Sequence, residues 1–146
     1  MKISRRVFLT SLTAVPIAGV AGGIHMRFHE PTWFEITEKN IEIKNLEKRI
    51  RVLHLSDFHA SPSVSLSDIE NAIDKALELN ADIAFLTGDF ITWDLAEPTE
   101  YRRILNKLAD TIPTYACIGN HDGGRWAGLS HGYKDFSKVS ELLKSS

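Results

Sequence analysis

Three apolar runs of strand length recur at intervals of about thirty residues, and each ends in side chains of the kind that bind metal ions. The runs are residues 50–55, 82–87 and 114–118, and segments with helical periodicity separate them. Strands and helices that alternate at this spacing are typical of βαβ units, in which successive strands lie parallel in one sheet. The sequence therefore predicts an α/β fold with the three runs as its core strands.

The segments around these runs carry start and stop signals. A capping box, Ser67–Glu70, predicts that the first helix begins there, and Asn80 is suited to its end. Pro98 is typical of the first turn of a helix and predicts the second one. We expect a third helix at residues 136–143. Residues 33–43 alternate in pieces between apolar and polar, which predicts half-buried or edge strands.

Polar clusters follow the three runs directly. They are Asp57-Phe58-His59, Gly88-Asp89 and Gly119-Asn120-His121-Asp122. Ligands of open parallel sheets bind beyond the carboxyl ends of the strands, so we expect the clusters to lie together at that edge. Their carboxylates suit hard divalent cations, and their imidazoles suit Mn²⁺, Fe²⁺ or Zn²⁺. The glycines let the backbone turn sharply and approach ligands closely.

The spacing of the clusters predicts how metal ions are shared. Asp57 and His59 are two residues apart, so on an extended strand end they project to the same side and reach one ion. Asp89 is placed to bridge this ion to a second one, to which Asn120 offers a carbonyl oxygen. The sequence therefore predicts a site for two divalent metal ions. For each residue taken singly, the alternative is a capping or turn role at a strand end.

Together the three clusters resemble the first three motifs of the calcineurin-like metallophosphoesterases, in order and in spacing. The resemblance covers about residues 50–122 and rests on the combination, since each dipeptide alone carries no weight. The context Leu55–His59 and the amino terminus are most similar to the exported bacterial branch. That branch includes cell-envelope phosphodiesterases and enzymes that cleave the diphosphate of acylated UDP-glucosamine.

The resemblance implies a sandwich-type metallophosphoesterase fold built from βαβ units. It also implies a metal-dependent hydrolase, a phosphodiesterase or phosphatase, in which two divalent metal ions activate water. Its substrate would be a phosphoester such as an envelope lipid or a UDP-diacylglucosamine-type compound.

The resemblance further implies a role for each matched residue. Asp57 and His59 would bind the first metal, and Asp89 would bridge the two ions. Asn120 would bind the second metal. His121 would act on the leaving-group oxygen as general acid, a task suited to a group whose ordinary pKa lies near neutral pH.

Two further residues in or directly after the third run have expected roles. Asp122 is expected to orient the His121 ring, as carboxylates beside a functional histidine often do. Cys117 is the lone cysteine, which excludes an intrachain disulfide framework. It is expected to be a small buried apolar residue on its strand.

The chain departs from the family pattern in its carboxyl-terminal part. Family members supply further histidines from a later strand and from a Gly-His-x-His element, which this sequence lacks. His131 precedes Gly132, in reverse order, and is not assigned as a replacement ligand. The chain is therefore expected to be only the amino-terminal half of the domain. The alternative to an active enzyme is a catalytically incomplete remnant that binds metal weakly, or half of a split enzyme with a carboxyl-terminal partner chain.

Residues 1–29 are expected to be a twin-arginine-like signal or anchor segment, and residues 30–146 the partial metallophosphoesterase domain. The run Ser4–Leu9 resembles the twin-arginine export motif through its arginine pair and the Phe and Leu that follow. Residues 7–24 carry no charge, but their glycines and Pro16 make a poor permanent membrane span. This predicts export to the periplasm or cell envelope, or attachment to the membrane. The alternative is an ordinary anchor with chance arginines, and cleavage of the leader stays open.

The charge balance argues against one class of partner. The chain has 17 basic and 19 acidic side chains, and four of the basic ones lie in residues 1–29, which leaves 13 against 19. Nucleic-acid-binding domains carry a basic face, so no nucleic-acid partner is expected. A mononucleotide-binding βαβ domain is a third reading, but none of the usual glycine-rich phosphate loops occurs.

Overall fold

The computed structural model describes residues 35–129 and 131–146, and these residues contain three strands and four helices. The strands are β1 (Val52–Leu55), β2 (Ile83–Thr87) and β3 (Thr114–Cys117), and the helices are α2 (Leu66–Leu77), α3 (Pro98–Ala109), α4 (Gly124–Leu129) and α5 (Ser137–Lys144). All of them belong to one compact unit, Thr37–Ser146. The predicted segment 1–29 and the boundary after it lie outside the described residues.

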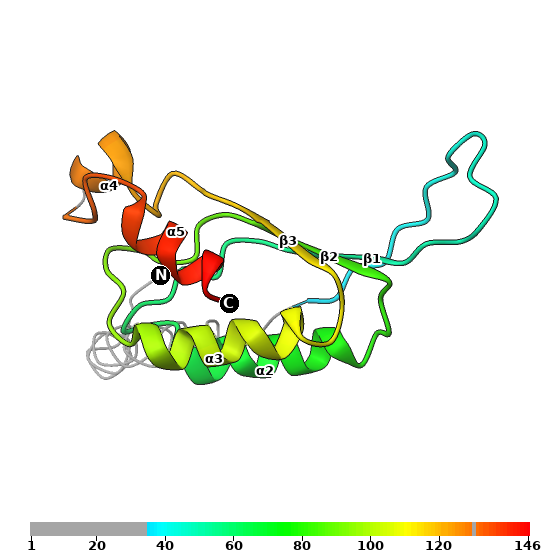
Figure 1. Cartoon of the computed structure of the whole chain (residues 1–146), viewed down its shortest axis with the longest axis horizontal. Helices are drawn as coiled ribbons and strands as arrows, with labels where there is room; N and C mark the ends of the chain where they lie inside the picture. Colours follow the sequence, from blue (N-terminus) through cyan, green and yellow to red (C-terminus); the bar gives the residue numbers. More distant parts are fainter. Residues whose placement is uncertain (1–34, 130) are drawn as a thin grey trace, which may run out of the picture. The chain divides into compact units, whose positions relative to one another are not determined.

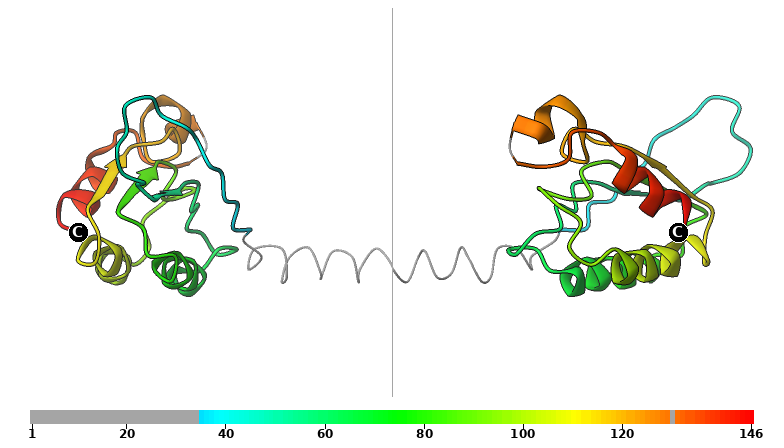
Figure 2. Two further views of the ribbon diagram at one scale, coloured as in Figure 1. Left: turned by 90° about the vertical axis from the view of Figure 1, so that its right-hand side faces the viewer. Right: turned by 60° about the vertical axis from the view of Figure 1, so that its left-hand side comes forward.

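The strands form one parallel sheet in the order β1-β2-β3, which confirms the α/β prediction. Helices α2 and α3 both lie on the same face of this sheet (Figures 1 and 2). The physical reason is handedness, since right-handed crossovers that always move in one direction along a sheet place their helices on one face. In Figure 1 the strands run toward the end of the sheet near α4, so the loops that follow them gather there.

The core lies between the sheet and the helices. It takes Ala84 and Leu86 from β2, Ile69 and Ile73 from α2, and Tyr101, Ile104, Leu105 and Leu108 from α3. Helices α3 and α5 also contact each other, and Val139 and Leu142 of α5 are buried. Among the helices of the described residues, none has the length and apolar character needed to cross a membrane.

The first helix begins two residues before the predicted start. Ser65 is the N-cap, and it forms the capping box with Asp68: each backbone N–H donates to the other side chain, at 3.2 Å and 3.0 Å. Ser67, the predicted cap, lies inside the helix. Both serines are followed three residues later by an acidic residue, so the local pattern fits either. The tight turn that pairs Ser61 with Val64 ends just before Ser65 and decides between them.

The end of this helix agrees with the sequence. The helix ends at Leu77, and Asn80 follows in the left-handed conformation with φ of 52°. Its N–H donates to the Leu77 carbonyl at 3.2 Å. The predicted starts of α3 at Pro98 and of α5 near residue 136 are confirmed, whereas the short helix α4 was not predicted.

The strand predicted in residues 33–43 does not form in its described part, residues 35–43. These residues are exposed, and Ile41 is 70% exposed. Alternation becomes a strand only when a sheet edge pairs with it. In the described residues β1 pairs with β2 alone. The alternation of apolar and polar residues in 35–43 therefore does not produce a strand.

The sheet face opposite the helices is open to solvent, and we call it the open face. It consists of Val52, His54, Phe85, Thr87, Tyr115 and Cys117, all of them exposed. The expectation that Cys117 is buried was therefore wrong. Side chains alternate between the two faces of a strand, and only one face of this sheet is covered by helices.

Candidate metal centre

The three polar clusters meet at the carboxyl ends of the strands, as the sequence predicted. Backbone hydrogen bonds continue the pairing of β1 and β2 past the strand ends: Asp57 N–H donates to the Gly88 carbonyl at 3.2 Å, and His59 N–H to the Asp89 carbonyl at 2.9 Å. These bonds fix the first cluster against the second before any metal is present.

Four of the five predicted site residues lie together. His59 Nε2 is 3.8 Å from Asp57 Oδ1 and 3.8 Å from Asp89 Oδ2. The His121 ring meets the His59 ring edge to face, with centroids 4.7 Å apart. One donor atom each of His59, Asp89 and His121 lies within 4.8 Å of the others.

This donor set fits a divalent metal ion. Ligand atoms that share an ion at about 2.0–2.2 Å lie roughly 3–4 Å apart, which is the spacing around His59. Carboxylates with imidazoles are the ligands that Mn²⁺, Fe²⁺ and Zn²⁺ accept. The Asp57 side chain is 61% exposed and that of Asp89 is 14% exposed, so the cluster is open to solvent on one side.

The backbone of the candidate ligands lies in the left-handed region of φ and ψ. The φ angles are 57° at Asp57, 46° at His59 and 54° at Asp89. The sequence predicted an extended strand end that points Asp57 and His59 to one side, and this reason was wrong although both do reach the cluster. Such conformations cost roughly 1–3 kcal/mol each in non-glycine residues and are concentrated at functional sites.

Two glycines allow the second and third clusters to touch. Gly88 has φ of 79°, and a Cβ there would lie 2.6 Å from Gly119 Cα. A Cβ on Gly119 would lie 2.2 Å from the Asp89 Oδ1 atom. Any side chain at residue 119 would therefore displace the Asp89 carboxylate.

The Asp89 carboxylate is held by the third loop. Its Oδ1 accepts a hydrogen bond from the His121 backbone N–H at 2.8 Å, which leaves Oδ2 facing His59. The His121 ring is placed by a group that the sequence did not indicate, since its Nδ1 lies 3.4 Å from the Thr92 carbonyl. A backbone carbonyl occurs at every residue, so no sequence signal marks it.

Asp122 does not orient the His121 ring as expected. It is fully buried, and its carboxylate accepts hydrogen bonds from backbone N–H groups. The donors are Asp89 at 3.0 Å, Phe90 at 2.7 Å, Ile91 at 3.3 Å and Gly119 at 2.8 Å. Burial raises the pKa of the Asp122 carboxyl above its ordinary value, and the backbone donors act against this shift.

Behind this carboxylate lies Tyr101 of α3, whose hydroxyl donates to the Phe90 carbonyl at 2.9 Å. Burial is the main cause that raises the pKa of the Tyr101 hydroxyl well above its ordinary value, and the negative charge of Asp122 adds to this shift. The hydroxyl therefore stays protonated and able to donate.

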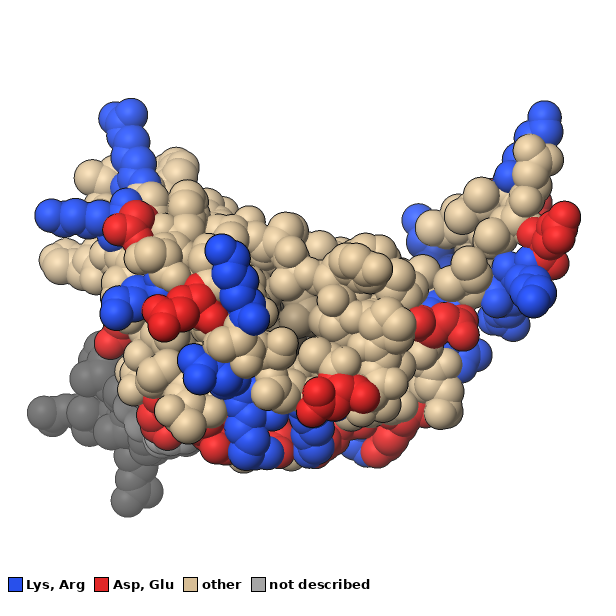
Figure 3. Space-filling view, viewed as in Figure 1, with Lys and Arg blue, Asp and Glu red and all other residues tan. Residues whose placement is uncertain are grey.

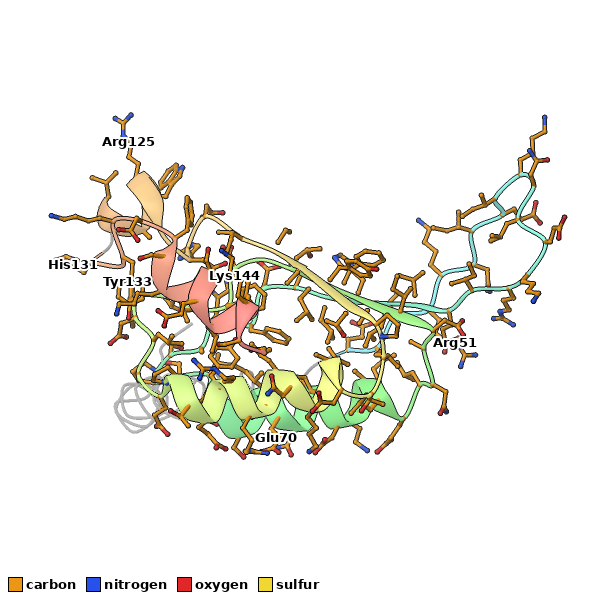
Figure 4. All side chains as sticks on the ribbon, in the orientation of Figure 1. Arg51, Glu70, Arg125, His131, Tyr133 and Lys144 are labelled. Atoms are coloured by element: carbon orange, nitrogen blue, oxygen red, sulfur yellow. The ribbon has the colours of Figure 1, made fainter. Side chains whose placement is uncertain are left out.

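The remaining candidates lie on the surface. Asn120 is exposed in the loop directly before His121, and its place at a second ion stays a prediction. His131 is exposed, and Figure 4 shows Arg125 and His131 pointing outward near α4. His131 is not part of the donor group formed by His59, Asp89 and His121.

Comparisons with known proteins agree with this geometry. The sequence model of the calcineurin-like phosphoesterases matches residues 50–146. Phosphodiesterase YaeI of Escherichia coli (strain K12) is 38% identical over 146 residues, which are 99% of this chain and 52% of that protein. The UDP-2,3-diacylglucosamine pyrophosphatase LpxG of Chlamydia trachomatis is 29% identical over 121 residues, 78% of this chain and 35% of that protein.

An uncharacterized metallophosphoesterase of Campylobacter jejuni is 25% identical over 142 residues, 97% of this chain and 35% of that protein. The chain thus spans about half the length of the first of these relatives and about a third of the other two. No solved structure matches the chain significantly.

Proposed function

Because this chain belongs to the calcineurin-like phosphoesterase family, we propose that it acts in metal-dependent hydrolysis of phosphoesters. The observation that carries the proposal is the meeting of Asp57, His59, Asp89 and His121 at the carboxyl ends of three parallel strands. The relatives named as a phosphodiesterase and a pyrophosphatase support a phosphoester bond as the target.

The site would hold two divalent ions, of Mn²⁺, Fe²⁺ or Zn²⁺. Asp57 and His59 would bind the first ion, Asp89 would bridge, and Asn120 would bind the second. Bound divalent ions supply a lowered pKa for water and positive charge for the phosphoryl oxygens. The 3.8 Å spacings around His59 support the first ion, and the exposed position of Asn120 leaves its amide accessible for the second.

His121 would donate a proton to the leaving-group oxygen. A hydrogen bond from Nδ1–H to the Thr92 carbonyl would fix the tautomer and leave Nε2 for this exchange. The backbone N–H of the same residue holds Asp89, so one residue serves both the proposed acid and the proposed bridge.

A second candidate function is favoured by one specific observation. His59, Asp89 and His121 present donor atoms that could all serve a single ion. In that case the chain would be a weak single-metal binder, catalytically incomplete, or one half of a split enzyme with a carboxyl-terminal partner chain.

The substrate and the location are also proposals. The amino-terminal arginine pair supports export by the twin-arginine route and a place near the membrane in the cell envelope. The likeness to a UDP-2,3-diacylglucosamine pyrophosphatase supports an envelope lipid or a lipid nucleotide as substrate.

Hydrolysis of bis(p-nitrophenyl) phosphate by the chain with added Mn²⁺ tests the activity. We expect turnover that falls at least about 100-fold in Asp89→Asn, because a bridging ligand is lost. Asp110→Asn makes the same chemical change at the exposed end of α3 and should keep full turnover. Folded chain that binds one Mn²⁺ without turnover would favour the second candidate instead.

A further inference from the structure

The Asp122 carboxylate joins two loops that otherwise belong to different strands. Its Oδ2 accepts N–H groups from both loops, that of Asp89 after β2 and that of Gly119 after β3. Its Oδ1 accepts the N–H groups of Phe90 and Ile91. In the described residues it is the one fully buried charged side chain, so its position is set by these donors rather than by solvent.

The two loops that Asp122 joins carry proposed metal ligands. The Asp89 N–H bond fixes the backbone from which a proposed bridging carboxylate projects. The Gly119 N–H bond fixes the loop whose His121 N–H in turn holds Asp89 Oδ1. A shift of either loop would therefore move the Asp89 carboxylate away from His59.

We propose that Asp122 is a positioning residue, which sets metal affinity by clamping the Asp89–Ile91 loop to the Gly119–His121 loop. The proposal rests on the proposed metal centre but assigns a role that the motif does not reveal. Asp122 touches no candidate ligand side chain through its own hydrogen bonds. It accepts hydrogen bonds from four backbone N–H groups. These bonds fix the backbone positions of Asp89 and His121.

The chemistry of the clamp requires a carboxylate. Each Asp122 oxygen accepts two N–H donors, so both oxygens must be acceptors. An asparagine has the same shape, but its NH₂ group is a donor. Whichever way it turned, two backbone N–H groups would face this NH₂ and lose their acceptor, in a buried place where unpaired donors are costly. Asp122→Asn is thus a nearly isosteric test of the clamp.

The test is a titration of the full chain with Mn²⁺. The electron spin-resonance signal of free Mn²⁺ measures how much of the ion stays unbound. We expect Asp122→Asn to weaken Mn²⁺ binding about 10- to 100-fold, the range seen when residues that support metal ligands are changed. Leu108→Ala is the matched control, since Leu108 is fully buried near the far end of α3. It should lower stability and keep the Mn²⁺ affinity of the unaltered chain.

The outcomes separate this inference from the proposed function. If the unaltered chain binds no Mn²⁺, the proposed metal centre is wrong and the clamp loses its purpose. If the unaltered chain binds but Asp122→Asn binds equally well, the centre stands and the clamp is overturned. Equal weakening in Leu108→Ala would also overturn it, because general instability would then account for the loss.

A second measurement does not depend on the variant folding. Coupling is reciprocal, so if the clamp favours metal binding, bound metal must favour the clamp. We expect Zn²⁺ to slow amide hydrogen exchange at Phe90, Ile91 and Gly119 in the unaltered chain. Unchanged exchange at these three amides with Zn²⁺ bound would overturn the proposal.

Discussion

At the residue scale, the site depends on backbone conformations that side chains usually avoid. Asp57, His59 and Asp89 all have positive φ, and two glycines let the second and third clusters touch. The hydrogen bonds to neighbouring loops hold these residues in place, which fixes the candidate ligands in space.

The strain at His59 gives a testable difference between two truncations. At φ of 46° the backbone of an alanine is more strained than that of a glycine. We therefore expect His59→Gly to be more stable than His59→Ala by about 1 kcal/mol. Urea unfolding of both variants measures it. At Asn71, exposed within α2, the order should reverse, because glycine costs about 1 kcal/mol against alanine inside a helix. Equal stabilities at residue 59 would show that this conformation is not strained.

At the element scale, charges join α2 to α3 on the surface away from the sheet. Glu70 of α2 accepts hydrogen bonds from Arg103 at 2.7 Å and from Lys107 at 3.1 Å, both on α3. Figure 4 shows Glu70 on α2, and Figure 3 shows charges of both signs gathered along these helices. Hydrogen bonds from Arg103 and then Lys107 lower the pKa of Glu70 from 4.5 to about 2.

This shift predicts a pH dependence of stability. A lowered carboxyl pKa contributes stability that is complete above the unfolded value of 4.5 and is lost as pH falls toward about 2. The free energy of unfolding of Glu70→Gln should therefore be below that of the unaltered chain at pH 6.5. The difference should narrow as pH falls below 4.5 and disappear only below about pH 2, where the carboxyl is protonated in the folded chain as well.

The control is Glu47→Gln, an exposed carboxylate outside the helices. It should change stability little at either pH. A gap for Glu70→Gln that is as wide at pH 2 as at pH 6.5 would show that the side chain acts through packing rather than through its charge. High salt should reduce the gap at pH 6.5, since exposed ion pairs are screened.

At the scale of the whole molecule, the sheet is covered on one face by helices and open on the other. On the open face Phe85 is 38% and Tyr115 is 59% exposed, with their rings stacked at 5.8 Å between centroids. Exposed apolar patches of this kind promote association.

The double variant Phe85→Thr with Tyr115→Thr tests the open face. We expect weaker fluorescence of bound anilinonaphthalene sulfonate and less self-association by light scattering, because the apolar patch is removed. Stability should fall only by about 0.5–1.5 kcal/mol, the value of an aromatic pair. Trp126→Thr, at a 71% exposed position on α4, is the matched control and should leave dye binding nearly unchanged. A loss of several kcal/mol in the double variant would show that this face is packed.

The sequence by itself determined the order of the three strands and of α2, α3 and α5, and it named the residues of the candidate site. Both are local properties, because apolar periodicity predicts strand or helix, and a ligand that directly follows a parallel strand lies at the sheet edge where the other strands also end. Asp57, His59, Asp89 and His121 could therefore be named and brought together without coordinates.

The tertiary structure alone decided what depends on contacts across the chain. Whether Cys117 is buried depends on what covers its sheet face, and whether residues 35–43 form a strand depends on a partner edge. The role of Asp122 likewise depends on N–H donors from residues about thirty positions away, which no local pattern records. Pairing and burial are properties of two segments at once, so one segment read alone cannot fix them.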